Sequence, residues 1–235
     1  MKKGIIYGVG VGPGDPELMT LKSVRLILEN DVIAVPGKNA RGSAAYQIAV
    51  KIIPELADKE LVAVCMPMTK DRKLLDEAHK KAAEQLEAYL DKGKNVVFLT
   101  LGDPSIYSTF SYLKRILEND GYTAEPVSGV PSFCAAAARL GIPLAESDEQ
   151  LHIIPALHIS EDSLSYPGNY VLMKSASHIK EVKELLEKSD LSVYMAENCG
   201  MGPEKIYRSA DEIPDTAGYF SLIIAKNNTE KENLR

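Results

Sequence analysis

Residues 4–29, GIIYGVGVGPGDPELMTLKSVRLILE, decide the fold class of this chain. Gly4 to Val9 is a short run of β-forming residues, and the stretch from Gly8 to Pro16 is a turn rich in glycine and proline. From Thr20 to Glu29, apolar residues recur at helical spacing. A strand, a turn and a helix in this order form the building unit of a parallel α/β sheet.

The rest of the chain alternates strand-sized apolar runs with helical patterns, which predicts an α/β protein throughout. The expected strands are 31–35, 61–65, 95–101, 124–127, 151–154, 170–174, 191–196 and 219–226. The expected helices are 44–53, 71–90, one that follows Pro104 and ends near Glu118, 132–140 and 177–188. The last strand is expected to pair antiparallel at a sheet edge, so the first sheet is largely parallel and the second is mixed.

The 235 residues suffice for two domains of ordinary size. Asn119, Asp120 and Gly121 form a helix stop near the middle of the chain, and this is the expected domain boundary. The predicted domains are therefore residues 1–120 and residues 121–235.

The composition excludes several classes of protein. The net charge of −6, without a long basic run, argues against nucleic acid as the main partner. No apolar run approaches the roughly 20 residues of a membrane span. Glycines from Gly8 onward interrupt any signal-peptide core, so we expect a cytoplasmic protein that does not enter a membrane.

A bound metal is not expected either. The three cysteines lie far apart, no CxxC spacing is present, and the four histidines form no HExxH pattern. Free thiols in a reducing compartment explain the cysteines.

The glycine-rich turn fails the spacing of a dinucleotide site. The GxGxxG motif needs glycines at offsets 0, 2 and 5, and from Gly8 or Gly10 the last position is Pro13 or Asp15. The prolines remove amide donors, and Asp15 places negative charge where a phosphate would lie. The turn therefore permits close approach by something other than a diphosphate, or it serves packing alone.

Two further turns follow expected strands. In LTLGDPSIYSTF (residues 99–110), Asp103 lies at the carboxyl end of a buried strand, where open α/β sheets bind ligands. Its carboxylate can accept hydrogen bonds from ribose hydroxyls or an amino group, or it can cap the next helix. In VSGVPSFCA (residues 127–135), small residues permit close approach of a ligand, or only tight helix packing.

Together these segments resemble the tetrapyrrole methylases. GVGPGDPELMTLKSVR (residues 10–25), LGDPSIYSTF (101–110) and VSGVPSFCAAAARLGIPL (127–144) occur in the order and approximate spacing of that family, and the similarity extends over about residues 4–226. GDPSIYSTF, together with ENCGMG at 197–202, is most similar to the precorrin-2 and cobalt-precorrin-2 (cobalt-factor II) C-20 methyltransferase branch.

The resemblance implies two class III methyltransferase-like α/β domains with the methyl donor, S-adenosylmethionine, in a cleft between them, and a homodimer. The donor-binding residues that it implies are Gly102, Asp103, Pro104, Ile106, Pro131, Ser132, Met173, Ala196, Ser221 and Leu222. Many relatives have threonine where this chain has Pro131, so Ser132 must supply the hydrogen bond that Pro131 lacks.

The implied acceptor is a reduced tetrapyrrole, cobalt-bound or metal-free, which carries several carboxylates. Gly12, Pro13, Gly14 and Asp15 are assigned to the substrate side. Lys38 and Arg41 follow the second expected strand and are the candidate carboxylate contacts; alternatively, they are solvated loop cations. Tyr107 and Lys174 are candidates for substrate contact or proton handling, against a packed helix tyrosine and a strand-end surface lysine.

Three other functions remain open at this stage. The first is a nucleotide-binding oxidoreductase. The second is another member of the same family, either a protein methyltransferase similar to diphthine synthase or a different precorrin methyltransferase. The third is a binding module without catalysis. The failed GxGxxG spacing disfavours the first, and the GDPSIYSTF context disfavours the second.

Overall fold

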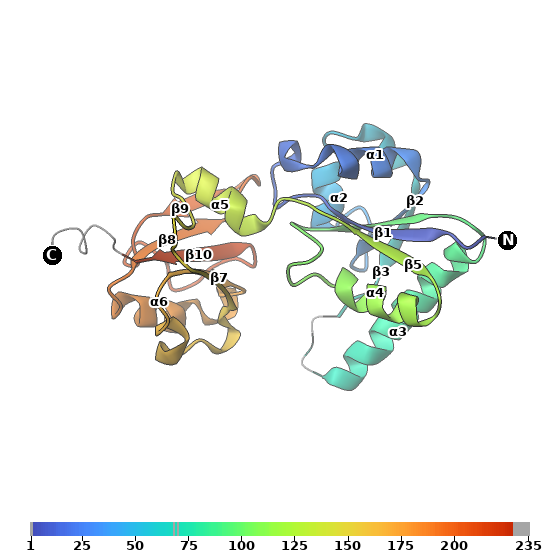
Figure 1. Ribbon diagram of the computed structural model, residues 1–235. Coiled ribbons are helices and arrows are strands. Elements are labelled where there is room, and N and C mark those ends of the chain that lie inside the picture. The colour runs from blue at the N-terminus through green and yellow to red at the C-terminus, as the bar shows by residue number, and fades with distance from the viewer. Residues whose placement is uncertain (1, 68, 70, 228–235) are drawn as a thin grey trace. The chain divides into compact units, whose positions relative to one another are not determined.

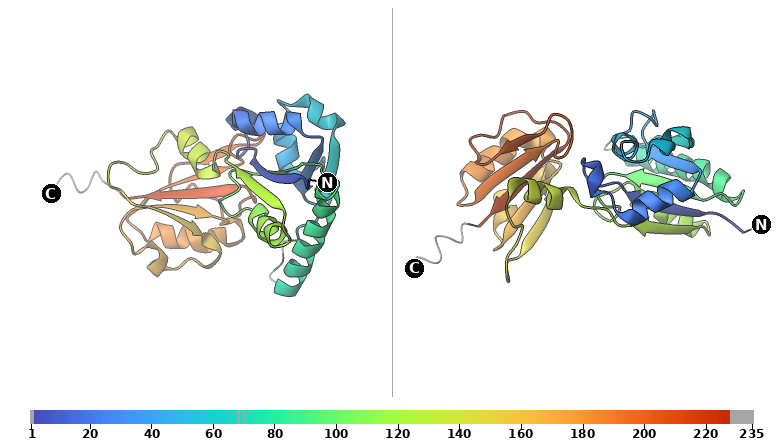
Figure 2. Two further views of the ribbon diagram at one scale, coloured as in Figure 1. Left: turned by 45° about the vertical axis from the view of Figure 1, so that its right-hand side comes forward. Right: turned by 90° about the horizontal axis from the view of Figure 1, so that it is seen from above.

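The computed structural model describes residues 2–67, 69 and 71–227. The chain divides into two compact units, residues 1–131 and residues 132–235, each built on its own five-stranded sheet (Figures 1 and 2).

All five strands of the first unit run parallel, in the order β3-β2-β4-β1-β5. The strands are β1 (Ile5–Gly10), β2 (Val32–Pro36), β3 (Glu60–Val64), β4 (Val96–Thr100) and β5 (Thr123–Val127). The α-helices are α1 (Leu21–Glu29), α2 (Ala44–Ala49), α3 (Arg72–Leu90) and α4 (Phe110–Asn119), with short 3-10 turns η1 (Pro16–Leu18) and η2 (Pro54–Asp58).

Helices cover both faces of this sheet. Figure 1 shows α1 and α2 on one face and α3 and α4 on the other. On the second face, Leu86 of α3 and Leu113 of α4 pack with Phe98 of β4, and all three are fully buried. Strand β4 is buried at every position, as its continuous apolar sequence predicts for a strand covered on both sides.

The second unit has a mixed sheet in the order β6-β7-β10-β8-β9. The strands are β6 (Leu151–Pro155), β7 (Asn169–Met173), β8 (Ser192–Glu197), β9 (Lys205–Tyr207) and β10 (Ser221–Lys226). The helices are α5 (Ser132–Leu140) and α6 (Ile179–Glu187), with turns η3 (Ala156–His158), η4 (Glu161–Leu164) and η5 (Ala176–His178). Figure 1 shows α5 and α6 on opposite faces of the sheet.

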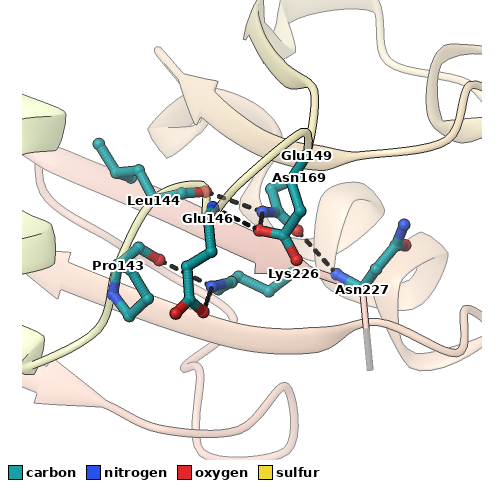
Figure 3. A network of polar contacts seen from close by, with 7 residues as sticks. All are labelled: Pro143, Leu144, Glu146, Glu149, Asn169, Lys226 and Asn227. Atoms are coloured by element: carbon teal, nitrogen blue, oxygen red, sulfur yellow. Dashed lines mark hydrogen bonds and ion pairs between the residues drawn. The ribbon is translucent and has the colours of Figure 1, made fainter. Parts of the chain in front are cut away.

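Buried polar contacts fix one end of the second sheet (Figure 3). The side chain of Asn169, fully buried at the start of β7, donates to the Leu144 carbonyl and to Glu149, both at 2.8 Å, and accepts from the Asn227 backbone at 3.0 Å. Lys226, at the end of β10, donates to the Pro143 carbonyl at 2.9 Å. These bonds hold the segment between α5 and β6 against the sheet.

Two predictions about architecture need correction. Strand β5 pairs with β1, so it belongs to the first unit, and the boundary lies after Pro131 rather than after Asp120. The last strand is antiparallel as predicted, but β10 lies between β7 and β8 and not at an edge. Its six residues are all buried, because a central strand is covered on both faces.

Candidate functional site

The three turns identified in the sequence follow neighbouring strands of the first sheet. Strand β1 lies between β4 and β5, and all three run parallel, so their carboxyl ends meet at one edge. The Val11 amide donates to the Thr100 carbonyl, and the Gly102 amide donates to the Gly12 carbonyl, each at 2.9 Å. The backbones of the first two turns are therefore tied together.

Three glycines pack backbone against backbone at this edge. A Cβ atom added to Gly10 would lie 2.4 Å from the Gly102 carbonyl oxygen, and one added to Gly129 would lie 2.2 Å from the same oxygen. Larger residues cannot occupy these positions without moving the turns. The sequence predicts that something approaches Gly10 closely, and in the structure the neighbouring backbone of Gly102 and Gly129 does so.

Asp103 ties the second turn to the third. Its Oδ1 accepts from the Ser105 amide at 2.8 Å and from the Ser105 hydroxyl, while its Oδ2 accepts from the Gly129 amide at 2.9 Å. Burial raises the pKa of Asp103, but the bonds from Ser105 and Gly129 outweigh it, and the pKa is lowered overall. The alternative that Asp103 caps the next helix is wrong, because α4 begins at Phe110 with Thr109 as its N-cap.

The other predicted residues of this edge lie in the same turns. Gly12 has a φ of 75° and Gly102 a φ of 65°, in the left-handed region that favours glycine. Pro13, Gly14 and Pro104 are buried, Ile106 is partly buried, and Asp15 accepts from the Glu17 amide as the N-cap of η1.

Tyr107 is no packed helix residue. It precedes α4, is 46% exposed, and has a φ of 49°. For a bulky side chain this left-handed conformation is an outlier.

In the second unit, three predicted donor residues form one row. Leu222 of β10 is aligned with Met173 of β7 and with Ala196 of β8. Residues aligned across strands share a face, and the neighbours Leu172, Met195 and Ile223 belong to the opposite face, in the core cluster of α6. The row therefore lies on the face covered by α5, which begins at Ser132.

Ser221 differs from the other members of this set. It precedes Leu222 in the strand, so its side chain points to the opposite face. Its hydroxyl donates to the Gly218 carbonyl at 2.6 Å, and this bond closes the turn before β10.

A strained turn follows Met173 at the end of β7. Lys174, the residue after Met173, is exposed and has a φ of 59°. The next residue, Ser175, is fully buried, and its hydroxyl has no hydrogen-bond partner within the described part of the chain. A buried hydroxyl without a partner is unfavourable, so this turn carries two energetic costs side by side.

The candidate cations follow β2. Lys38 is exposed. The Arg41 guanidinium donates to the Tyr46 hydroxyl at 3.0 Å and to the Ala57 carbonyl at 2.8 Å, so it fixes the segment around α2 and η2. Among the described residues, two of its five N–H donors are used in this way, which leaves others for a carboxylate.

Among residues 2–67, 69 and 71–227, no group of three or more histidine, cysteine or acidic side chains could hold a metal ion. No helix in the same residues is long and apolar enough to cross a membrane.

Sequence reasoning missed the residues that organise these turns. They are Gly129, which donates to Asp103, the hydroxyl pair of Thr100 and Ser108, and Ser175, whose hydroxyl has no partner in the described part of the chain. Small and hydroxyl-bearing residues are common in every turn, so their types alone gave no signal.

Comparison with known proteins shows the family of the chain. The family model for Tetrapyrrole (Corrin/Porphyrin) Methylases matches residues 5–213. The chain is 34% identical to the probable cobalt-precorrin-2 C(20)-methyltransferase of Methanocaldococcus jannaschii, over 94% of this chain and 95% of that protein. It is 30% identical to the cobalt-precorrin-2 C(20)-methyltransferase of Salmonella typhimurium, over 97% and 98% of the two chains.

A solved structure shares the fold. Uroporphyrin-III C-methyltransferase from Thermus thermophilus, in complex with S-adenosylhomocysteine, matches with a TM-score of 0.70 at 21% identity, over 95% of this chain and 92% of that one.

Proposed function

Because the chain belongs to the tetrapyrrole (corrin/porphyrin) methylase family, we propose that it transfers a methyl group from S-adenosylmethionine to C-20 of precorrin-2 or cobalt-precorrin-2, a step in cobalamin biosynthesis. One observation carries the choice of acceptor. The similarity to two C(20)-methyltransferases spans almost the whole of each chain at 34% and 30% identity.

Both units contain surfaces that suit the donor. In the first unit, the Gly102–Asp103 turn is rigidly tied to its neighbours and presents backbone groups at the carboxyl edge of the sheet. In the second unit, Met173 is partly buried beside the buried Leu222 and Ala196, so Met173 is the member of the row that can contact an adenine ring or a thioether. The uroporphyrin-III enzyme with S-adenosylhomocysteine supports the choice of ligand.

In this assignment Asp103 acts mainly through the backbone. Its two carboxylate oxygens already accept three hydrogen bonds within the first unit. It therefore holds the turn on which Gly102, Pro104 and Ile106 lie, and any bond from the donor to Asp103 must use remaining lone pairs.

The donor supplies an electrophilic methyl group on a sulfonium. In the transfer, the methyl–sulfur bond breaks as a bond forms to the nucleophilic ring carbon, which then loses its proton. Positive charge disperses in this step, so the protein acts by alignment and by exclusion of water rather than by a strong base. Rigid turns and an apolar row are suited to this task.

The acceptor is a polycarboxylate, and the net charge of the chain is −6, so attraction must be local. Lys38 and the unused N–H groups of Arg41 are the proposed carboxylate contacts, with Gly12 to Asp15 on the substrate side. The homodimer, the cytoplasmic location and the roles of Tyr107 and Lys174 likewise stay predictions.

Methylation assays test the function directly. The purified protein is incubated with radiolabelled S-adenosylmethionine and either precorrin-2 or cobalt-precorrin-2, with excess S-adenosylhomocysteine as the inhibited control. We expect one methyl group per ring, assigned to C-20 by NMR, and the preferred ring form tells whether cobalt is already present. Methylation of uroporphyrinogen III, a later precorrin or a protein instead would assign the chain to another branch of the family.

A further inference from the structure

The backbone of Tyr107 is held in a conformation that its side chain disfavours. Its φ of 49° lies in the left-handed region, which glycine and asparagine adopt readily and a bulky aromatic residue rarely adopts. Nearly half of the side chain is exposed, at 46%. Such a conformation persists only where the surrounding structure imposes it.

The turn is fixed on the amino side of Tyr107. Ser105 donates both its amide and its hydroxyl to Asp103, and Asp103 in turn accepts from the Gly129 amide of the neighbouring turn. The Ile106 amide donates to the Asp103 carbonyl at 3.2 Å. The chain is therefore constrained up to the residue before Tyr107.

The turn is fixed equally on the carboxyl side. The hydroxyl of Ser108, the next residue, hydrogen-bonds at 2.9 Å to the hydroxyl of Thr100, the last residue of β4. Both residues are buried, at 7% and 5% exposure. A hydrogen bond between buried groups is costly to break, because each partner would be left without one.

Ser108 also fixes the start of α4. Its hydroxyl accepts from the Phe110 amide at 3.2 Å, and its carbonyl accepts from the Ser111 hydroxyl at 2.8 Å. Phe110 is buried against Gly8, where an added Cβ atom would lie 2.2 Å from the ring. The helix cannot shift to let Tyr107 relax.

We propose that the hydroxyl pair of Thr100 and Ser108 positions Tyr107, holding it in the left-handed conformation so that its phenol contacts the tetrapyrrole acceptor. This inference rests on the function proposed above. Thr100 and Ser108 are positioning residues, because they act through Tyr107 and touch no substrate themselves.

The chemistry of the phenol favours the acceptor over the donor as its partner. A tyrosine offers a ring face to a flat macrocycle and an O–H donor to a carboxylate. Nearly half of the Tyr107 side chain is exposed, so part of its surface can contact a bound ring.

Steady-state kinetics test the positioning role. Thr100→Val and Ser108→Ala each remove one hydroxyl of the pair, and Tyr107→Phe removes the phenol hydroxyl. We expect each variant to raise the KM for the tetrapyrrole several-fold, while the Kd of S-adenosylhomocysteine, measured by calorimetry, changes less than twofold. The control is Asn30→Ala, which breaks a buried hydrogen bond to the Leu26 carbonyl at the opposite edge of the sheet.

Thermal unfolding gives a readout that does not depend on the acceptor. Tyr107→Gly relieves the left-handed strain, so we expect its Tm to rise by roughly 2–4 °C, whereas Thr100→Val lowers the Tm. Greater stability together with lower methylation would mark Tyr107 as strained for function.

The outcomes separate the two proposals. A wild-type protein that methylates neither ring form would overturn the proposed function, while the Tm of Tyr107→Gly would still report the strain. An active wild type whose Thr100→Val and Ser108→Ala variants match Asn30→Ala in KM would overturn the positioning role. A lower Tm for Tyr107→Gly, or a larger effect on donor Kd than on acceptor KM, would overturn it too.

Discussion

The Asp103 contacts of the first unit lie beside its candidate residues, whereas the Asn169 contacts of the second unit lie at the opposite end of β7 from Met173. In the first unit, the contacts tie the turns at the carboxyl ends of β4, β1 and β5, where Asp103 binds Gly129 and Thr100 binds Ser108. In the second unit, the buried contacts of Asn169 gather where β7 begins and β10 ends (Figure 3). At the other end of that sheet, Ser175 is buried and its hydroxyl has no hydrogen-bond partner among residues 2–67, 69 and 71–227.

This difference indicates how rigidity is distributed in each unit. The candidate residues of the first unit are held by bonds among themselves, so their geometry is set before any ligand binds. In the second unit, the turn that follows Met173 contains the Ser175 hydroxyl, for which the described residues supply no partner. A ligand or a water molecule that binds at that turn can form a hydrogen bond with the Ser175 hydroxyl.

The largest expected effect comes from removing the anchor of the second unit. Asn169→Ala removes a fully buried side chain that makes three hydrogen bonds to partly buried or exposed partners, so we expect the free energy of unfolding of this unit to fall by about 2–4 kcal/mol. Denaturant unfolding measures it.

Asn227→Ala is the matched control. Asn227 contributes only its backbone amide to Asn169, so truncating its side chain should change stability by less than about 0.5 kcal/mol. Equal stability of the two variants would show that the network does not anchor the sheet.

The next effect breaks the tie within the first unit. Asp103→Ala removes the acceptor of the Gly129 amide, so the glycine turns loosen and donor affinity falls by about 1.5–3 kcal/mol, tenfold or more in Kd. Calorimetry with S-adenosylhomocysteine measures the loss. Ser105→Ala keeps the bond to Gly129 and should lose much less, whereas an unchanged Kd for Asp103→Ala would separate this turn from donor binding.

The elements around these contacts were largely predictable, because hydrophobic period and strand ends are local properties. The expected strand 95–101 exceeds β4 by one residue at each end, and the expected helix 71–90 begins one residue before α3 and ends with it. Pairing is not local. Nothing in residues 124–127 indicates that β5 joins β1, and the antiparallel insertion of β10 between β7 and β8 depends on the whole second sheet.

The candidate site shows the same limit. Motifs indicated the turns that follow β1, β4 and β5, and the row that includes Met173 and Ala196. The hydrogen bonds that shape the turns, from Ser105 and Gly129 to Asp103, join residues whose proximity only the sheet order determines. The positive φ of Tyr107 and Lys174 had no sequence signal either, since neither residue type favours that region.

A pair of serine substitutions tests the comparison most directly. Ser108 and Ser175 each follow an exposed left-handed residue and are buried, but only Ser108 has a hydroxyl partner within the described residues. Ser108→Ala should therefore cost about 1–2 kcal/mol of stability, while Ser175→Ala should be neutral or stabilising by up to about 1 kcal/mol.

Chemical denaturation of the free protein measures both variants. A loss for Ser175→Ala as large as that for Ser108→Ala would mean that ordered water satisfies Ser175. In that case both serine hydroxyls are hydrogen-bonded, and the two units do not differ in this respect.

The smallest effect is a pH dependence that involves His79 in the first unit. His79 of α3 is buried and stacks on Tyr112 of α4, with ring centroids 4.7 Å apart. Burial lowers its pKa, with Asp76 raising it and Arg115 lowering it to smaller extents. The folded pKa thus lies below the unfolded value near 6.5, so between the two values only the unfolded chain binds the proton. Stability from neutral His79 is complete above about pH 6.5 and falls as the pH drops through the folded pKa.

Hydrogen exchange of α3 and α4 between about pH 7.5 and about pH 5.5, corrected for the intrinsic rate, should show this loss. His79→Phe keeps a stacked ring without a titratable proton, so its α3 and α4 should lose less protection than those of the wild type. Equal losses in the two proteins, or an equal loss in α6 of the second unit, would assign the acid sensitivity to carboxylates spread over the whole molecule.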